Sequence, residues 1–468
     1  MKKLFFTALF LSATSLFFAQ ANVSVVSSTG NSNDVDVVQT GLTNNSDVLQ
    51  LGDSNTADVT QLGTLNDSDI DQVGDFNTAL LDQNGNGNTS IQDQDGDSND
   101  AIANQLGNVN ASSQNQTGDL NTASVDQNGN TNTASQVQVG DSNDTTIDQI
   151  GDLNTASQVQ VGDDNTAVID QVGMLNVATQ SQVGDDNYAY AEQYGDFNVA
   201  AQSQTGDDNM AYIYQGETYN TAVQTQVGDS NVAKSYQNDI SLGGSNLSVQ
   251  SQTGDNNVAT VDQGLEYSFQ NIASQMQIGD YNYAYAYQTG NNNISREVQV
   301  GDGNDSSVYQ NGDSNTSGVG PVPSPPATFS AYGQYGDNNI AVTDQVGDYN
   351  DSKIYQEGDN NDAKVDQQGN HNGALVFSLG DSNHADLLSN GDWNVNLVRQ
   401  FGNGNSVDSD QIGDLNVSSA IQAGNGNTVL SLQNGNSNFS LTTQTGLGHS
   451  NTLTQIGNSN NSNVTQSN

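Results

Sequence analysis

The sequence predicts an all-β protein, a β-solenoid of about 19 two-stranded rungs of 22 residues each, stacked in parallel and in register. Three observations lead to this fold class. A glutamine returns every 11 residues from Gln39 to Gln237, and it almost always opens the motif Gln-x-Gly-x-x-Asn. The residues before each of these glutamines alternate with a period of two. The 4 prolines all fall between residues 321 and 326. The repeats therefore contain no proline, whose backbone could not donate a hydrogen bond to a β-ladder.

Each predicted strand ends at the periodic glutamine. In residues 165–171, the first, third, fifth and seventh residues are Asn, Ala, Ile and Gln, and those between them are Thr, Val and Asp. This is the period of a β-strand, with the first set on one face and the second on the other. A glycine two residues later allows the backbone to bend before the next strand. The predicted arc glycines are Gly151, Gly162, Gly173, Gly184 and Gly195.

Two kinds of strand alternate along the chain. One kind reads Ala-x-Gln-x-Gln, as in residues 156–160 and 178–182, and the other has an apolar or small residue in place of the first Gln, as at Ile147 and Ile169. The repeating unit is therefore a rung of two unlike strands that face each other across a thin core. Rungs paired about 4.8 Å apart give a body on the order of 90 Å long.

Stacked in register, the repeated amides would form hydrogen-bonded ladders that satisfy buried polar groups and fix the register. This structural role is also the expected functional one. The predicted ladder residues in the most regular part of the chain are Gln149, Asn154, Gln160, Asn165, Gln171, Asn176, Gln182, Asn187, Gln193 and Asn198.

The chain divides into five segments. Residues 1–21 read as a secretory signal peptide, with Lys2 and Lys3 before a short apolar run and small residues that suit cleavage after Ala19 or Ala21. The apolar run is too short for a comfortable membrane span. An N-terminal segment, 22–32, precedes a first repeat block, 33–315. A proline-containing loop, 316–333, separates this block from a second one, 334–468.

Composition alone would suggest disorder, because the net charge is -47 and only 33% of the residues are hydrophobic. The fixed phase argues against disorder, which has no physical reason to keep Gln and Asn five residues apart. Cysteine is absent, so an exported chain of this length must be held together without disulfides. The acidic balance argues against binding to nucleic acids or anionic membranes, and no membrane insertion is expected.

Acidic and aromatic residues recur in the arcs and on the outward strand positions. An aspartate follows the arc glycine in many units, and Asp163, Asp185 and Asp207 form a candidate weak cation row whose mutual repulsion would slow assembly. A solvated acidic face is the alternative interpretation. Outward tyrosines such as Tyr283, Tyr285 and Tyr287 would stack across strands or serve lateral association.

Nothing in the sequence favours an enzyme. The chain has 3 histidines, its basic residues after the signal are few and scattered, and no pair of carboxylates is singled out for acid or base catalysis. We therefore expect no catalytic residues and no cofactor.

The motif resembles the curlin repeat of bacterial curli fibre subunits, and Asn165, Gln171, Gly173, Asn176 and Gln182 lie at matching positions. The resemblance covers nearly the whole mature chain. It implies a β-solenoid that is secreted through an outer-membrane pore, meets a nucleator and polymerises outside the cell into functional amyloid. The leading Ser of the family motif is usually Asn here, and the chain is far longer than the familiar subunits. The roles of major subunit and nucleator therefore both stay open.

The expected function is that of a secreted structural subunit whose copies self-assemble into extracellular fibres for a biofilm matrix and adhesion. The repeat pattern runs from Asn33 to Gln466 without a capping element, so both terminal rungs are expected to offer open strand edges. The alternative is a monomeric secreted β-solenoid that binds a ligand such as ice, for which a flat and regular Thr-rich face would be needed.

Overall fold

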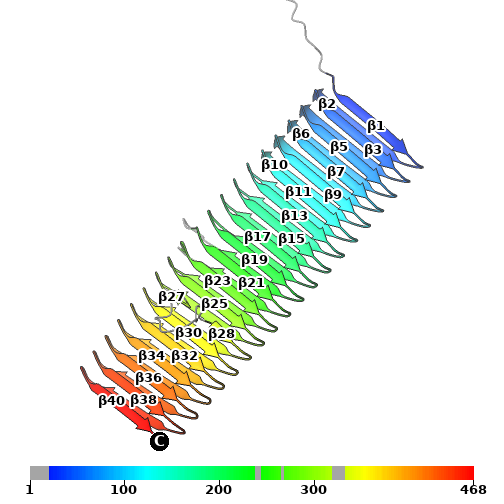
Figure 1. The fold of residues 1–468 in the computed structure, drawn as a ribbon. Coiled ribbons are helices and arrows are strands. Elements are labelled where there is room, and N and C mark those ends of the chain that lie inside the picture. The colour runs from blue at the N-terminus through cyan, green and yellow to red at the C-terminus, as the bar shows by residue number, and fades with distance from the viewer. Residues whose placement is uncertain (1–20, 238–243, 265–267, 319–332) are drawn as a thin grey trace, which may run out of the picture.

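The protein is a long β-solenoid built from two facing sheets, as the sequence predicts. The structure, a computed structural model, describes residues 21–237, 244–264, 268–318 and 333–468. Nearly all of the predicted signal peptide, 1–21, therefore lies outside the described residues. Figure 1 shows the strands side by side along the whole length, from the N-terminal blue end to the C-terminal red end. Within the described ranges no helix is long and apolar enough to cross a membrane.

One sheet, called sheet A, contains the strands that carry the Ala-x-Gln-x-Gln pattern in the first block. Its strands in spatial order are β1 (Val23–Thr29), β3 (Asn45–Leu51), β5 (Asp67–Val73), β7 (Thr89–Asp95), β9 (Ala111–Thr117), β11 (Thr133–Val139), β13 (Thr155–Val161), β15 (Val177–Val183), β17 (Val199–Thr205), β19 (Thr221–Val227), β21 (Leu247–Thr253), β23 (Ile272–Ile278), β25 (Ile294–Val300), β27 (Thr316–Ser317) with β28 (Gly333–Tyr335) on one level, β30 (Asp351–Glu357), β32 (Gly373–Leu379), β34 (Val395–Phe401), β36 (Val417–Ala423), β38 (Phe439–Thr445) and β40 (Asn461–Ser467).

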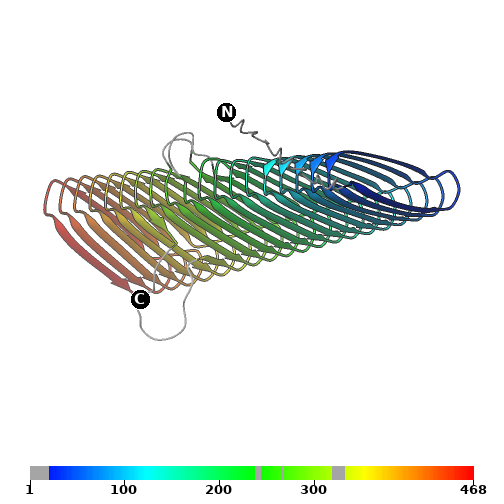
Figure 2. The ribbon, with the colours of Figure 1, turned by 90° about the horizontal axis from the view of Figure 1, so that it is seen from above.

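The facing sheet, called sheet B, contains the remaining strands. In spatial order they are β2 (Asp34–Leu42), β4 (Thr56–Thr64), β6 (Thr78–Asn86), β8 (Asp100–Asn108), β10 (Thr122–Asn130), β12 (Asp144–Ile150), β14 (Thr166–Val172), β16 (Tyr188–Tyr194), β18 (Met210–Gln215), β20 (Val232–Gln237), β22 (Val258–Gln263), β24 (Tyr283–Thr289), β26 (Asp305–Asn311), β29 (Ile340–Val346), β31 (Asp362–Gln368), β33 (His384–Asn390), β35 (Ser406–Ile412), β37 (Thr428–Asn434) and β39 (Ser450–Ile456). Figure 2 shows the two sheets joined at both edges by short arcs.

Register is kept by parallel pairing of residues one rung apart. In sheet B, Gln171 pairs with Gln149 on one side and with Gln193 on the other, so that equivalent residues lie directly above each other. The insertions do not disturb this register, because Gln237 still pairs with Gln263 and Gln310 still pairs with Gln345. The insertions fall between strands, where added residues cost little.

The break between the blocks is narrower than the predicted loop. Residues 319–332, which include all four prolines, lie outside the described residues. Thr316 and Ser317 pair with β25 and β30, and so does the short strand that begins at Gly333. The ends of the predicted loop, 316–333, thus belong to sheet A and form one interrupted level of it.

The arcs depend on two residues with positive φ. Gly173 has a φ of 132° and Leu175 a φ of 58°, so an arc combines a glycine-only conformation with a left-handed residue of any type. A Cβ at Gly162 would collide with the carbonyl oxygen of Gly184 in the next rung. The backbone amide of Gly162 donates to the carbonyl of Val139, 2.9 Å away, in the previous rung. Close stacking of the arcs is therefore what requires glycine.

The core is narrow and largely polar, as the strand alternation predicts. In β14 the side chains of Ala167, Ile169 and Gln171 are buried, whereas Thr166, Val168 and Asp170 point outward. Small apolar residues from both sheets pack in the middle of the first block, among them Ile147, Ile169 and Ala178. The second block has a more apolar core that includes Val376, Leu387 and Val398.

Candidate functional site

The periodic glutamines form continuous amide ladders inside the stack. The side-chain Nε2 of Gln149 donates to Oε1 of Gln171 at 2.8 Å, and Gln171 donates in the same way to Gln193 at 2.8 Å. Each Nε2 also donates across the core to a backbone carbonyl of the opposite sheet, as from Gln171 to Thr155 at 3.2 Å. Because both amide protons are used, one side chain ties a rung to its neighbour and one sheet to the other.

A second glutamine ladder runs through sheet A of the first block only. Gln158 donates to Gln180 at 2.9 Å and to the carbonyl of Thr146 in sheet B at 2.9 Å. The ladder starts at Gln92 and ends at Glu297. In the second block the same level of the core is apolar, with Ile354, Val376 and Val398.

The predicted asparagines close the corners between strand and arc. The backbone amide of Asn165 donates to Oδ1 of Asn143 at 3.1 Å, and its Nδ2 donates to the carbonyl of Gly184 at 2.7 Å. Asn176 makes the equivalent bonds to Asn154 and to the carbonyl of Gly195. All the predicted ladder residues from Gln149 to Asn198 are at most 1% exposed. The structure therefore brings the predicted residues together. The glutamines form one column in each sheet, and the asparagines form one column at each edge where the two sheets are joined.

The arc aspartates form a row along the edge where the chain passes from sheet A to sheet B. The backbone amide of Asp163 donates to Oδ1 of Asp185 at 2.9 Å, and that of Asp185 donates to Asp207 at 2.9 Å. Asn403 and Asn425 take the same place and accept the same bond in the second block. The carboxylates are thus acceptors that join arcs together, a role that the sequence did not predict beside repulsion, cation binding or a solvated face.

Other arc aspartates belong to the opposite edge. Asp152 and Asp196 lie in arcs that lead from sheet B to sheet A, and they accept bonds from the backbone amides of Asn130 and Met174. Across the ranges that the structure describes, no group of three or more His, Cys, Asp or Glu residues could hold a metal ion. The cation row of Asp163, Asp185 and Asp207 stays a prediction.

A column of carboxylates also lies on the outer face of sheet B. Desolvation by the surrounding strands raises the pKa of Asp148 to about 6, and repulsion from Asp170 and Asp126 adds to the effect. Burial also raises the pKa of Asp170, with a contribution from Glu192. These outward residues are therefore half-buried and electrostatically coupled, which the two-residue alternation alone could not show.

Glu297 is the one carboxylate inside the amide ladders among the described residues. Its Oε1 accepts a bond from Gln275 Nε2 at 3.3 Å and from Ser295 Oγ at 3.4 Å, while its Oε2 has no partner. Burial raises the pKa of Glu297 to about 8 even though hydrogen bonds to its carboxylate, chiefly from Gln275, oppose the shift. A cavity of about 30 Å³ adjoins it.

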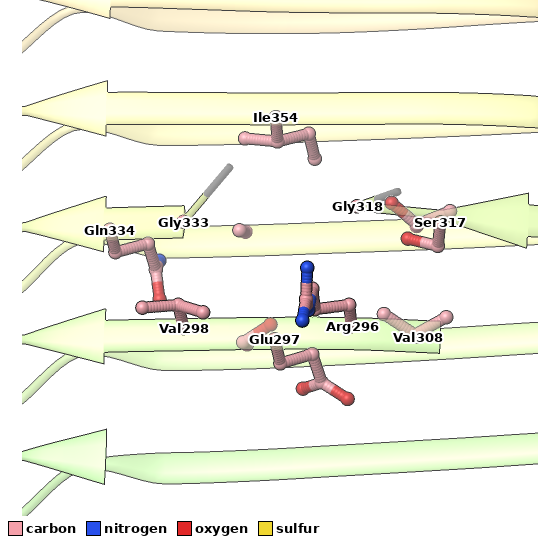
Figure 3. Close-up of a pocket in the computed structure, with 12 residues that line it drawn as sticks. Arg296, Glu297, Val298, Val308, Ser317, Gly318, Gly333, Gln334 and Ile354 are labelled. Atoms are coloured by element: carbon pink, nitrogen blue, oxygen red, sulfur yellow. The ribbon is translucent and has the colours of Figure 1, made fainter. Parts of the chain in front are cut away.

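The cavity lies at the interrupted level of sheet A. Figure 3 shows the strand of Ser317 stopping near Gly318 and a strand resuming at Gly333, on the level next to Glu297 and Val298. No residue pairs in register with Glu297 on that side within β27 or β28. Glu297 ends the second glutamine ladder as an acceptor, because its Oε1 takes the bond that Gln275 donates.

Outward tyrosines stack across neighbouring strands, which was one of the two roles left open. The rings of Tyr190 and Tyr212 lie 5.2 Å apart and nearly parallel, and those of Tyr285 and Tyr309 lie 5.4 Å apart and tilted. A similar stack on the arcs joins Tyr349, His371 and Trp393. Such pairs stabilise neighbouring rungs by about 0.5–1.5 kcal/mol each beyond their area.

The strands at the two ends of the stack are exposed on their inward sides. β1 and β2 pair only with β3 and β4, and β39 and β40 pair only with β37 and β38. Side chains that are buried in interior rungs, such as the ladder glutamines, are here half-exposed at Gln39 and Gln466. Each end of the described stack thus presents strand edges and ladder amides to solvent.

Comparison with known proteins supports the resemblance seen in the repeats. The family model of the curlin associated repeat matches residues 30–63, 66–91, 140–173, 162–195, 184–216 and 358–387. The matched segments lie in both repeat blocks and confirm the predicted repeat type. Among curated proteins, no sequence match was found.

Proposed function

Because six segments of the chain match the curlin associated repeat, we propose that this curlin-like subunit is secreted and that its copies add end to end into extracellular amyloid fibres. The fibres would serve a biofilm matrix and cell adhesion. Family resemblance further suggests a nucleator protein and an outer-membrane secretion pore as partners. The polymer itself needs only copies of this chain.

The observation that carries the proposal is the near-equivalence of the rungs. Most interior rungs join their neighbours through the same parallel backbone bonds, glutamine amides and asparagine amides, and serines replace the ladder glutamine at 378 and 389. A rung from a second copy can therefore meet the terminal strands with the same donors and acceptors. Such in-register stacking of identical amides is the arrangement found in cross-β fibres. Unpaired strand edges are known to recruit further chains.

Fibre formation by the purified chain tests the proposal. Residues 22–468 should assemble into thioflavin-positive fibres with diffraction spacings of about 4.7–4.8 Å and about 10 Å. A chain that stays monomeric for days at high concentration, with β-rich circular dichroism, would refute end-to-end addition. That result would favour the monomeric ligand binder.

We also propose that the role of the chain is structural. Its match to the curlin associated repeat supports this role, and arc carboxylates such as that of Asp185 accept hydrogen bonds between arcs.

A further inference from the structure

The negative charge is unevenly distributed between the two sheet faces. In sheet A from β9 to β25, the described outward strand positions contain no Asp or Glu, and their only charged residue is Arg296. Sheet B carries outward carboxylates at Asp126, Asp144, Asp148, Asp170 and Glu192 in β10 to β16, whereas the described outward positions of β18 to β24 carry only Asp262 and the cation Lys234 as charges. A chain with a net charge of -47 thus keeps one broad face almost free of charge.

This face, called the neutral face, is also flat and partly apolar. Its outward residues are mostly Ser, Thr, Ala and Val, and several valines are well exposed, including Val161 at 40%, Val183 at 43% and Val227 at 42%. A shallow groove runs along its middle, between Ser157 and Thr225, where the side chains are smallest. Small and β-branched side chains on a flat sheet allow a second sheet to pack at about 10 Å.

The neutral face is large enough for a stable interface. Its nine strands, at about 4.8 Å each, extend about 43 Å along the stack, and strands of 7 residues at about 3.3 Å per residue are about 23 Å wide. The footprint is about 1,000 Å² per copy, or about 2,000 Å² for two copies. Stable protein interfaces bury about 1,200–2,000 Å² in total.

We propose that the neutral face is the surface through which two copies of this chain pair side by side, sheet A against sheet A. Carboxylates disfavour pairing of two acidic copies at other surfaces, because β10 to β16 of sheet B carry the carboxylate column and one arc edge carries the row of Asp163, Asp185 and Asp207. Like charges placed opposite each other at an interface oppose association. Pairing therefore occurs where the carboxylates are absent.

The acidic edge also selects the orientation of the pair. A two-fold axis parallel to the stack sets the acidic edge of one copy beside the opposite arc edge of the other, which has Asp152 and Asp196 but also exposes Leu153, Leu175 and Phe197. A two-fold axis parallel to the strands would bring the two acidic edges together on one side. The first arrangement keeps the acidic rows apart, so paired stacks point in the same direction.

Charge insertion on the neutral face tests the pairing. The test variant carries Ser157→Asp, Thr179→Asp and Ala201→Asp on three successive strands of sheet A. The matched control carries Ser124→Asp, Thr146→Asp and Val168→Asp at the same strand position in sheet B. Circular dichroism establishes that both variants fold, sedimentation velocity measures pairing of soluble chains, and electron microscopy measures fibre width.

Wild-type chains and the sheet B variant should sediment as pairs and form fibres two stacks wide. The sheet A variant should sediment at half that mass and form single stacks, while its fibres still lengthen at the wild-type rate. Equal pairing in both variants, or loss of pairing only in the sheet B variant, would overturn the proposal. Fibres that never form while soluble pairs persist would refute end-to-end addition and leave the pairing intact. A wild-type chain that stays single at every concentration but depresses the freezing point of water non-colligatively would overturn the pairing and assign the face to ice.

Cross-linking tests the orientation. Since the chain has no cysteine, copies with Ala201→Cys can be mixed with copies with Ser203→Cys. An axis parallel to the stack, over the middle of the strand, sets residue 201 opposite residue 203 of the other copy, so mixed disulfides should exceed those between like copies. An excess of disulfides between like copies would overturn this orientation.

Discussion

Replacing Glu297 by Gln should stabilise the junction between the two blocks at neutral pH and remove its dependence on pH. The pKa of Glu297 is raised from 4.5 to about 8 in the folded chain, chiefly by desolvation. Between these two values the folded state keeps the proton while the unfolded state loses it, so stability falls as the pH rises. The loss is about 1.4 kcal/mol per pH unit. From pH 5 to pH 7.5 it amounts to about 3 kcal/mol, whereas a neutral glutamine loses nothing.

Hydrogen exchange resolves this effect at the right place, because a stack of repeats need not unfold as one unit. After correction for intrinsic rates, the opening free energy of β25 should fall by about 3 kcal/mol over this pH range in the wild type. In Glu297→Gln it should stay constant. Glu357→Gln is the control, because Glu357 is exposed and the side-chain oxygen of a glutamine there can still accept the hydrogen bond from the Tyr355 hydroxyl. Equal pH dependence in the wild type and in Glu297→Gln would refute the reasoning.

Three further predictions concern the repeats. Gly162→Ala should lower the free energy of unfolding, measured by chemical denaturation, by about 1–3 kcal/mol from backbone strain alone, and it should slow fibre growth. Gly373→Ala should be neutral in the same assay, because an added Cβ there meets nothing within 4 Å. Changing the three stacked glutamines 149, 171 and 193 together to Ala should leave buried amides unpaired at about 1–3 kcal/mol per group, and resistance to denaturant should drop far more than for the outward set 148, 170 and 192; equal damage would mean that the strand faces are misassigned. Changing the arc aspartates 163, 185 and 207 to Asn should keep the bonds between arcs, remove repulsion and shorten the assembly lag, whereas Ala at the same positions should lengthen it; lags that do not respond to either change would show that this row has no influence on assembly.

The fold could be predicted from the sequence because its determinants repeat. A single alternation fixed which side chains point inward, and the position of Gly and Asn after Gln171 located the arc. The backbone of the arc was less predictable. Leu175 and Phe197 adopt positive φ, although bulky residues rarely do so in isolation. The backbone hydrogen bonds between stacked arcs hold this conformation, and the conformational propensities of single residues do not include such bonds.

Departures from the repeat carried the information that sequence reasoning did not use. Glu297 stands 22 residues after Gln275, in the column of the second glutamine ladder, so its position alone could have marked the end of that ladder. Its burial and its unpaired oxygen are features that only the structure shows. Charge sorting between the faces of sheets A and B could likewise have been found by separating the two strand types before counting the carboxylates.

The polar core has a thermodynamic consequence. Unfolding exposes apolar surface, which raises the heat capacity, and polar surface, which lowers it. In this stack the buried side chains are largely Gln, Asn, Ser and Ala, so the heat-capacity change per residue should be smaller than in an ordinary globular domain. A small heat-capacity change flattens the curve of stability against temperature. The stack should therefore lose little stability on cooling, when a core held mainly by the hydrophobic effect weakens.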